Sequence, residues 1–145
     1  MNIIHSITIK TTPKRLYTAL TTSKGISGWW TPKAKAVPKV GSTVEVTFSG
    51  GFEVSFRVKQ LKPGRRVVWT AEQVPPAWAG SQISFDLKKE GRMVEFTFTH
   101  AGVSQDYSFF NFCWAQYVRS IKLLVETGKG EPRGTRASDA WHPLE

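Results

Sequence analysis

Residues 111–128 read Asn-Phe-Cys-Trp-Ala-Gln-Tyr-Val-Arg-Ser-Ile-Lys-Leu-Leu-Val-Glu-Thr-Gly, and this stretch decides the fold. Together with Phe110, its large apolar side chains recur every third or fourth residue, which is the spacing of one face of an α-helix. The opposite face carries Gln116, Arg119, Lys122 and Glu126. Gly128 ends the pattern, because glycine readily takes the left-handed conformation that closes a helix. We therefore predict a long amphipathic helix near the C-terminus.

Five strand-like runs precede this helix. Apolar and polar residues alternate over 43–48, 52–58, 67–71, 83–88 and 94–100, the spacing of strands with one buried face. Ser49-Gly50-Gly51, Pro63-Gly64 and Glu90-Gly91 supply turns between them. Residues 73–81 contain adjacent prolines and are predicted to be irregular. Because the turns are short, we predict that consecutive runs pair as antiparallel strands.

The first forty residues predict one more strand and two short helices. His5, Ile7 and Ile9 alternate with polar residues and indicate a strand. Thr12 followed by Pro13 is typical of a helix start, and a second helix is expected to end near Trp29-Trp30. Residues 31–41 show no periodicity and are predicted to be a loop. These elements bury their apolar faces only if the sheet curls around the terminal helix, so we predict an α+β fold built around a cavity.

Length and composition fit a single domain. The chain has 145 residues with 40% hydrophobic and 21% charged residues, and six Trp and nine Phe make it rich in aromatics. We predict a domain over 1–130 and a loose tail over 131–145, whose last residues, Leu144-Glu145, have the look of a vector-derived ending. No apolar run reaches the roughly 20 residues of a membrane span, and no signal peptide opens the chain. A cytoplasmic protein without a membrane span is expected.

The cysteine count and the charge limit the partners. A lone cysteine, Cys113, excludes an intrachain disulfide and a thiolate-rich metal site, and we predict neither a metal nor a cofactor. The net charge is +9, and seven lysines and arginines precede the first carboxylate, Glu45. This basic third is either a solvated face or a surface for anions. No nucleic-acid-binding motif accompanies it, so no specific nucleic-acid partner is predicted.

Several motifs, taken in order, resemble a known superfamily. They are Thr12-Pro13, Ala19-Leu20-Thr21, Gly28-Trp29-Trp30, Leu61 through Trp69, Phe96 through His100, and Trp114 with Ile121, Leu124 and Gly128. The chain resembles START-like domains of the SRPBCC superfamily, and within it the stand-alone domains related to the activator of the Hsp90 ATPase. The resemblance implies a helix-grip (Bet v 1-like, START-like) fold, with a curved antiparallel sheet wrapped around the long helix and two short helices between the first two strands. Cys113 stands where relatives often have glycine.

Inward-facing aromatic residues are the candidate ligand contacts, because small-molecule pockets are mostly apolar. Trp29, Trp30 and Trp78 are expected near the entrance. The full predicted set is Trp29, Trp30, Phe52, Val54, Phe56, Trp69, Trp78, Phe85, Phe96, Phe98, His100, Phe110, Cys113, Trp114 and Tyr117. The same side chains could instead fill the core of a curled sheet.

A catalytic grouping is not evident. The sequence has no Ser-His-Asp arrangement, paired carboxylates, phosphate loop or metal-ligand spacing. Its strand carboxylates, Glu45, Glu53, Asp86 and Glu95, fall on the outward parity. His5, His100 and Tyr117 are the inward groups able to act as an acid or base or to orient a ligand. No catalytic residue is predicted, and an enzyme is disfavoured.

Three functions stay in competition. The first is a carrier or sensor that binds a small hydrophobic or aromatic molecule, lipids included. The second, implied by the resemblance, is a chaperone-related interaction module with a role in stress response, in which the basic region contacts an acidic partner. The third, also implied by the resemblance, is a cyclase, dehydratase or hydrolase. The protein is expected to be a monomer or a homodimer, with Trp29, Trp78 and Trp141 as candidate exposed contacts.

Overall fold

A curled antiparallel sheet carries all three helices of the described chain on one face. The computed structural model describes residues 1–133. Within them the strands and helices are β1 (Asn2–Ile9), α1 (Pro13–Thr21), α2 (Ser23–Trp29), β2 (Lys33–Lys35), β3 (Thr43–Thr47), β4 (Glu53–Lys62), β5 (Arg66–Gln73), β6 (Gln82–Glu90), β7 (Met93–Ala101) and α3 (Tyr107–Thr127). Short 3₁₀ turns lie at Ser49–Gly51 and Pro76–Trp78. The predicted helix-grip architecture is confirmed.

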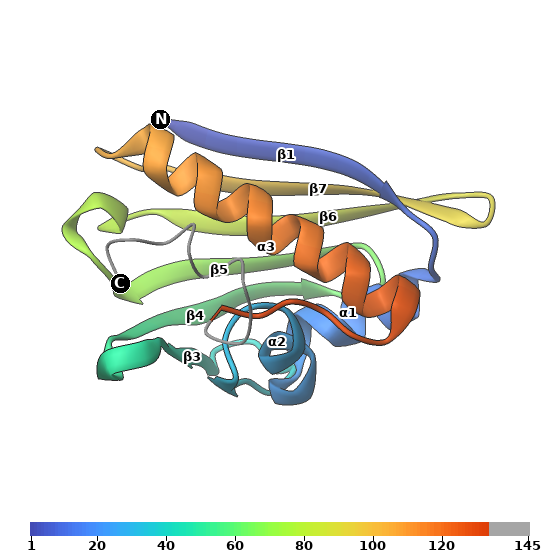
Figure 1. Ribbon diagram of the computed structural model, residues 1–145, viewed down its shortest axis with the longest axis horizontal. Coiled ribbons are helices and arrows are strands. Elements are labelled where there is room, and N and C mark those ends of the chain that lie inside the picture. The colour runs from blue at the N-terminus through green and yellow to red at the C-terminus, as the bar shows by residue number, and fades with distance from the viewer. Residues whose placement is uncertain (134–145) are drawn as a thin grey trace.

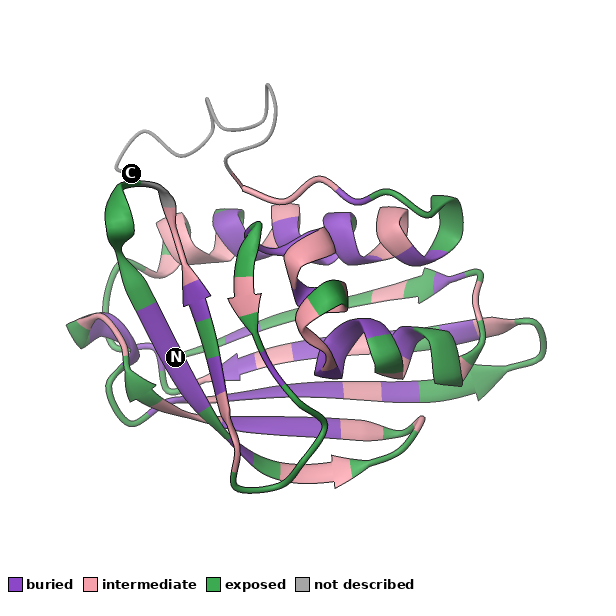
Figure 2. Cartoon of the chain, turned by 90° about the horizontal axis from the view of Figure 1, so that it is seen from below, coloured by how far each residue is buried: buried purple, intermediate pink, exposed green. Residues whose placement is uncertain are grey.

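The strands form a single sheet with the order β1-β7-β6-β5-β4-β3-β2 (Figure 1). Strands β2 to β7 follow one another as a meander, and β1 joins the far edge beside β7, with Ile3 opposite His100. Helix α3 crosses the concave face, and α1 and α2 lie near its C-terminal end (Figure 1). Figure 2 shows buried residues on the strands and on the helices, and these residues form one core cluster.

Threonine caps start both short helices, as predicted for α1. Thr12 Oγ1 accepts a hydrogen bond from the Arg15 amide at 3.2 Å, and Thr22 Oγ1 accepts one from the Gly25 amide at 3.1 Å. The two helices meet closely, because a Cβ at Gly25 would lie 2.5 Å from the Ala19 carbonyl oxygen. This close contact directs Trp29 and Trp30 into the space under α3.

Three local predictions are corrected by the structure. The predicted loop over 31–41 contains β2, an edge strand whose stability comes from its hydrogen bonds to β3 rather than from apolar periodicity. Phe52 was predicted to begin a strand and to face inward, but it is 53% exposed. Gly50 and Gly51 have positive φ angles, and β4 begins only at Glu53. Trp29 is fully buried and Trp78 nearly so, so neither is the exposed dimer contact that was expected. The third candidate, Trp141, lies outside the described residues.

Polar contacts fix the C-terminal end of α3 to the end of β1. The Glu126 carboxylate accepts hydrogen bonds from the Lys10 amide at 2.8 Å and from the Lys122 ammonium at 2.7 Å. Lys122 also donates to the Thr8 carbonyl at 2.7 Å. The hydrogen bond from Lys122, followed by that from the Lys10 amide, lowers the pKa of Glu126. Gly128, with a φ of 88°, then closes the helix as predicted.

The C-terminal segment, residues 129–133, turns back along α3 toward α2. Gly130 is buried, the Glu131 amide donates to Ser120 Oγ at 2.8 Å, and the Arg133 amide donates to the Trp30 carbonyl at 2.8 Å. Residues 131–133 were predicted to begin a loose tail, yet these hydrogen bonds hold them against the domain. The rest of that predicted tail, 134–145 with Leu144-Glu145, lies outside the described residues.

Replacing Gly130 by alanine is expected to release the C-terminal segment. The new Cβ would lie 2.3 Å from the Gly28 carbonyl oxygen and 3.1 Å from that of Ser120, and backbone atoms cannot yield as a flexible side chain would. We expect Gly130→Ala to lose about 1–3 kcal/mol of unfolding free energy in urea titrations. Hydrogen exchange should show the Arg133 amide losing protection. Lys129→Ala, at an exposed neighbour, is the control, and unchanged protection in Gly130→Ala would contradict the tight packing.

Candidate functional site

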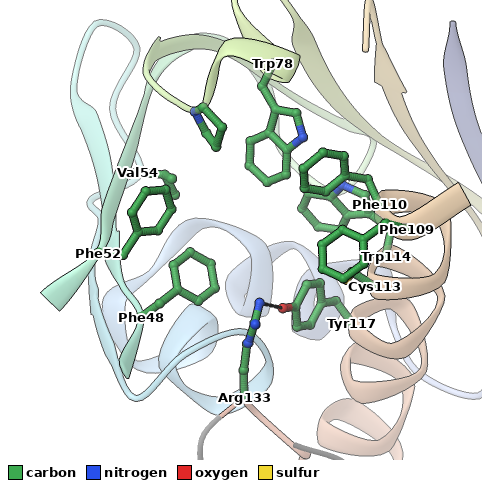
Figure 3. Close-up of a pocket in the computed structure, with 11 residues that line it drawn as sticks. Phe48, Phe52, Val54, Trp78, Phe109, Phe110, Cys113, Trp114, Tyr117 and Arg133 are labelled. Carbon is green, nitrogen blue, oxygen red and sulfur yellow. Dashed lines mark hydrogen bonds between the residues drawn. The ribbon is translucent and has the colours of Figure 1, made fainter. Parts of the chain in front are cut away.

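A mostly apolar pocket opens between the β3–β4 hairpin and the N-terminal half of α3. Its volume is about 340 Å³. Figure 3 shows side chains of the hairpin on one side, those of α3 on the other, Trp78 at one end and Arg133 at the opposite end. The lining residues are Phe48, Phe52, Val54, Pro75, Trp78, Phe109, Phe110, Cys113, Trp114, Tyr117 and Arg133. The pocket is thus built from four chain segments that are distant in sequence.

The predicted ligand contacts divide into two groups. The pocket is lined by Phe52, Val54, Trp78, Phe110, Cys113, Trp114 and Tyr117. The others do not line it but lie buried in the core, and they are Trp29, Trp30, Phe56, Trp69, Phe85, Phe96, Phe98 and His100. Strand parity and the helical stripe predicted that most of these residues face inward, but neither pattern carries information about depth beneath the helix.

Many of the inward aromatic residues lie in the core because they pack around Trp30. Its ring stacks on Trp29 at 5.5 Å and on Trp69 at 6.3 Å between centroids, and it lies 5.1 Å from Trp114. These contacts join α2, the sheet and α3 in one aromatic cluster. Because Trp30 is fully buried, it fills the volume that would otherwise extend the pocket under α3. The cavity therefore stays confined to the hairpin side.

His100 belongs to a closed hydrogen-bond network behind the pocket. Its Nδ1 accepts a hydrogen bond from Trp114 Nε1 at 3.1 Å, so the proton of the neutral ring resides on Nε2. Nε2 lies 2.8 Å from Ser81 Oγ and donates to it. Burial of the ring lowers the pKa of His100 to about 4. This tautomer cannot take a proton from Ser81, so the pair is not arranged as a nucleophile and its base.

The other two candidate acid–base groups also have defined positions. His5 is half-buried on β1 and does not line the pocket, and its Nε2 has no hydrogen-bond partner among the described residues. Tyr117 does line the pocket, and its hydroxyl accepts a hydrogen bond from Arg133 Nη1 at 3.2 Å. Only Tyr117 of the three is therefore placed to touch a bound molecule.

Four lining residues were not in the predicted set. Phe48 follows β3, Pro75 lies between β5 and the Pro76–Trp78 turn, and Phe109 lies in the first turn of α3. Arg133 lay in the predicted tail, and no sequence pattern connects it with Tyr117. Its guanidinium also lies over the Phe48 ring, 5.3 Å from the centroid. A cation–π contact and a hydrogen bond thus place one arginine between the two walls.

The lone cysteine lines this pocket as a protonated thiol. Burial raises the pKa of Cys113 to about 11, and the charge of Arg133 opposes this rise in part. Among residues 1–133, no group of three His, Cys, Asp or Glu side chains is placed to hold a metal ion. No helix in the same range is long and apolar enough to cross a membrane. The described pocket offers shape and apolar surface rather than a reactive group.

Comparisons with known proteins identify one family and several structures of similar fold. The family described as Activator of Hsp90 ATPase homolog 1-like protein matches residues 10–126. The solution structure of the Aha1 dimer from Colwellia psychrerythraea is similar, with 37% identity, a TM-score of 0.80, and coverage of 90% of this chain and 99% of that chain. A Mesorhizobium loti protein has 20% identity and a TM-score of 0.75, covering 87% and 97% of the two chains. A protein of the dynemicin biosynthetic locus has 18% identity and a TM-score of 0.73, covering 89% and 48%. No curated protein matches the sequence.

The buried His100 is expected to make stability depend on pH. An unfolded histidine gains a proton near its ordinary pKa of 6.5, whereas the folded ring stays neutral down to about pH 4. The unfolded state therefore binds more protons in this window, and stability falls as the pH is lowered, by up to about 3 kcal/mol. Urea titrations of wild type and His100→Gln between pH 7 and pH 4 measure it. The difference in unfolding free energy between wild type and His100→Gln should shrink as the pH falls. A difference that stays constant with pH would contradict the lowered pKa of His100.

Proposed function

This chain belongs to the Activator of Hsp90 ATPase homolog 1-like family, and we propose that it binds a small apolar or aromatic molecule in the pocket between the β3–β4 hairpin and α3. One observation carries the proposal: the pocket encloses about 340 Å³ and nearly all its lining is aromatic or aliphatic. Pockets of this size and lining suit small organic ligands. A carrier or sensor of such molecules, lipids included, is the activity that this site supports best.

The shape of the lining favours a planar molecule. Phe110 contacts Trp78 edge to face at 5.1 Å between ring centroids, and it contacts Phe109 in the same manner at 5.3 Å. Such rings present both edges and faces, which attract another aromatic ring beyond the simple burial of area. Phe52, half-exposed at the rim, adds apolar surface where a ligand would enter. A fused aromatic ring system is therefore a suitable first probe.

The residues around this pocket favour ligand binding over catalysis. His100 is held by Trp114 and Ser81 in the network described above, and burial keeps it uncharged at neutral pH. Glu95, on the neighbouring part of β7, is exposed on the other face of the sheet and cannot pair with His100. These features support a carrier or sensor over a cyclase, dehydratase or hydrolase.

Bromonaphthalene is expected to quench the tryptophan fluorescence in a saturable manner, because its heavy atom would lie against Trp78 and Trp114. Cys113→Leu adds bulk inside the pocket and should weaken binding by roughly 10-fold or more, since a mismatch of this size is worth about 1–3 kcal/mol. Ala115→Leu adds bulk to α3 outside the lining and is the matched control. Thermal unfolding confirms that both variants fold. Linear, unsaturable quenching in wild type would contradict the proposal.

A second candidate function is contact with an Hsp90-type chaperone, which family membership supports. Lys33, Lys35 and Lys39 are exposed on β2 and the loop after it, at one edge of the sheet. Val37 and Val40 lie among them, each 55% exposed. A basic edge with exposed apolar side chains suits an acidic protein surface. Homodimerisation, a role in stress response and a cytoplasmic location remain predictions for this chain.

Charge reversal tests this second function. Purified Hsp90 should bind the wild-type chain at low salt and release it as salt screens the contact. Replacement of Lys33, Lys35 and Lys39 by Glu should weaken binding by at least about 10-fold, because like charges then face each other. Glu at Lys88, Lys89 and Arg92, three exposed positions of the β6–β7 hairpin, reverses the same charge elsewhere. Equal losses in both triple variants, or no binding by wild type, would contradict a specific site at the β2 edge.

A further inference from the structure

Arg133 is the one formally charged residue among the described side chains that line the pocket. Arginine stays protonated at any pH that a folded protein tolerates, so its charge cannot be removed by burial. The field of this charge acts inside the pocket, because Arg133 opposes the burial-induced rise in the pKa of Cys113 on the α3 wall. An apolar pocket therefore has one cationic end.

Backbone amides help to hold the C-terminal segment in place. They do this through the Arg133 amide on the Trp30 carbonyl and the Glu131 amide on Ser120 Oγ. The guanidinium instead extends to the pocket, where Nη1 donates to the Tyr117 hydroxyl and the planar group lies over Phe48 (Figure 3). These two neighbours orient the guanidinium at the end of the pocket opposite Trp78.

A second, smaller hollow adjoins the pocket at this point. It has a volume of about 190 Å³, and Phe48 and Arg133 line both spaces. Its other lining residues include Lys33 and the two glycines of the β3–β4 turn, Gly50 and Gly51. The site therefore changes from aromatic to basic across Arg133, which is the arrangement that an amphipathic anion requires.

We infer that the pocket selects aromatic carboxylic acids, with the ring system among Trp78, Phe110 and Trp114 and the carboxylate paired with the Arg133 guanidinium. This inference rests on the proposed ligand-binding function and names the chemical class of its ligand. The planar guanidinium presents parallel N–H donors that match the two oxygens of a carboxylate. Lys33, across the adjoining hollow, adds positive charge on the approach to the same group.

Isothermal titration of naphthoate and naphthamide tests the inference, since the two probes share their rings and differ in charge. Wild type should bind naphthoate roughly 10- to 100-fold more tightly, the ratio expected for a charge-assisted hydrogen bond. Arg133→Gln should remove this preference and leave naphthamide affinity within about 2-fold. Arg133→Lys keeps the charge without the planar fork and should restore part of it. Arg92→Gln removes one exposed charge on the β6–β7 hairpin and should change neither affinity.

The outcomes separate the inference from the function on which it rests. Equal wild-type affinities for the two probes, unchanged by Arg133→Gln, would overturn the carboxylate selection and leave apolar binding intact. A loss of both probes to the same extent in Arg133→Gln would also overturn it, because Arg133 would then act on pocket shape alone. If wild type binds neither probe, both the inference and the proposed binding function are wrong.

Discussion

Trp114 packs between α3 and the sheet, and this packing positions the helix and the pocket beside it. The indole is buried, with ring centroids 4.3 Å from Phe98 on β7 and 5.1 Å from Trp30 after α2. One side chain of α3 thus contacts both the sheet and the α2 region. Aromatic rings bury large areas and pack with preferred geometry, so these contacts determine where α3 crosses the concave face. The pocket is the space that remains beside it.

The same indole also determines the chemistry of the interior. By donating to His100 Nδ1, it assigns the imidazole proton to Nε2 and directs it to Ser81. A buried polar group is stable only when it is hydrogen-bonded, and this network satisfies a histidine that is fully shielded from water. His100 and Ser81, which could otherwise act in catalysis, therefore have a structural role here. The described lining of the pocket is mostly apolar, with the Tyr117 hydroxyl, the Cys113 thiol and the Arg133 guanidinium as its polar groups.

The C-terminal segment connects fold and function. Gly28 and Gly130 make its course possible, since Gly28 lets α2 approach Leu124 of α3 and Gly130 lies against the Gly28 carbonyl. Backbone hydrogen bonds then place Arg133 opposite the β3–β4 hairpin. Without Arg133, the described lining of the pocket would carry no formal charge. The segment after the helix adds the Arg133 guanidinium to one end of the pocket.

The elements whose side chains repeat with a regular period could be predicted from the amino-acid sequence. The stripe of α3, the alternation in β3 to β7, the Thr12 cap and the Gly128 stop all follow from local backbone geometry, and together they predicted a curled sheet around a helix. Only the tertiary structure decided which inward aromatics are core and which line the pocket, because parity places Trp69 and Val54 alike. Strand β2 also depends on tertiary structure, because its backbone hydrogen bonds go to β3 at the edge of the sheet. The position of Arg133 depends on its contacts with Trp30 and Tyr117, which are distant in the sequence. The depth of a side chain beneath the helix and its contacts with distant residues depend on how the helices and strands pack against one another. No local sequence pattern encodes that packing.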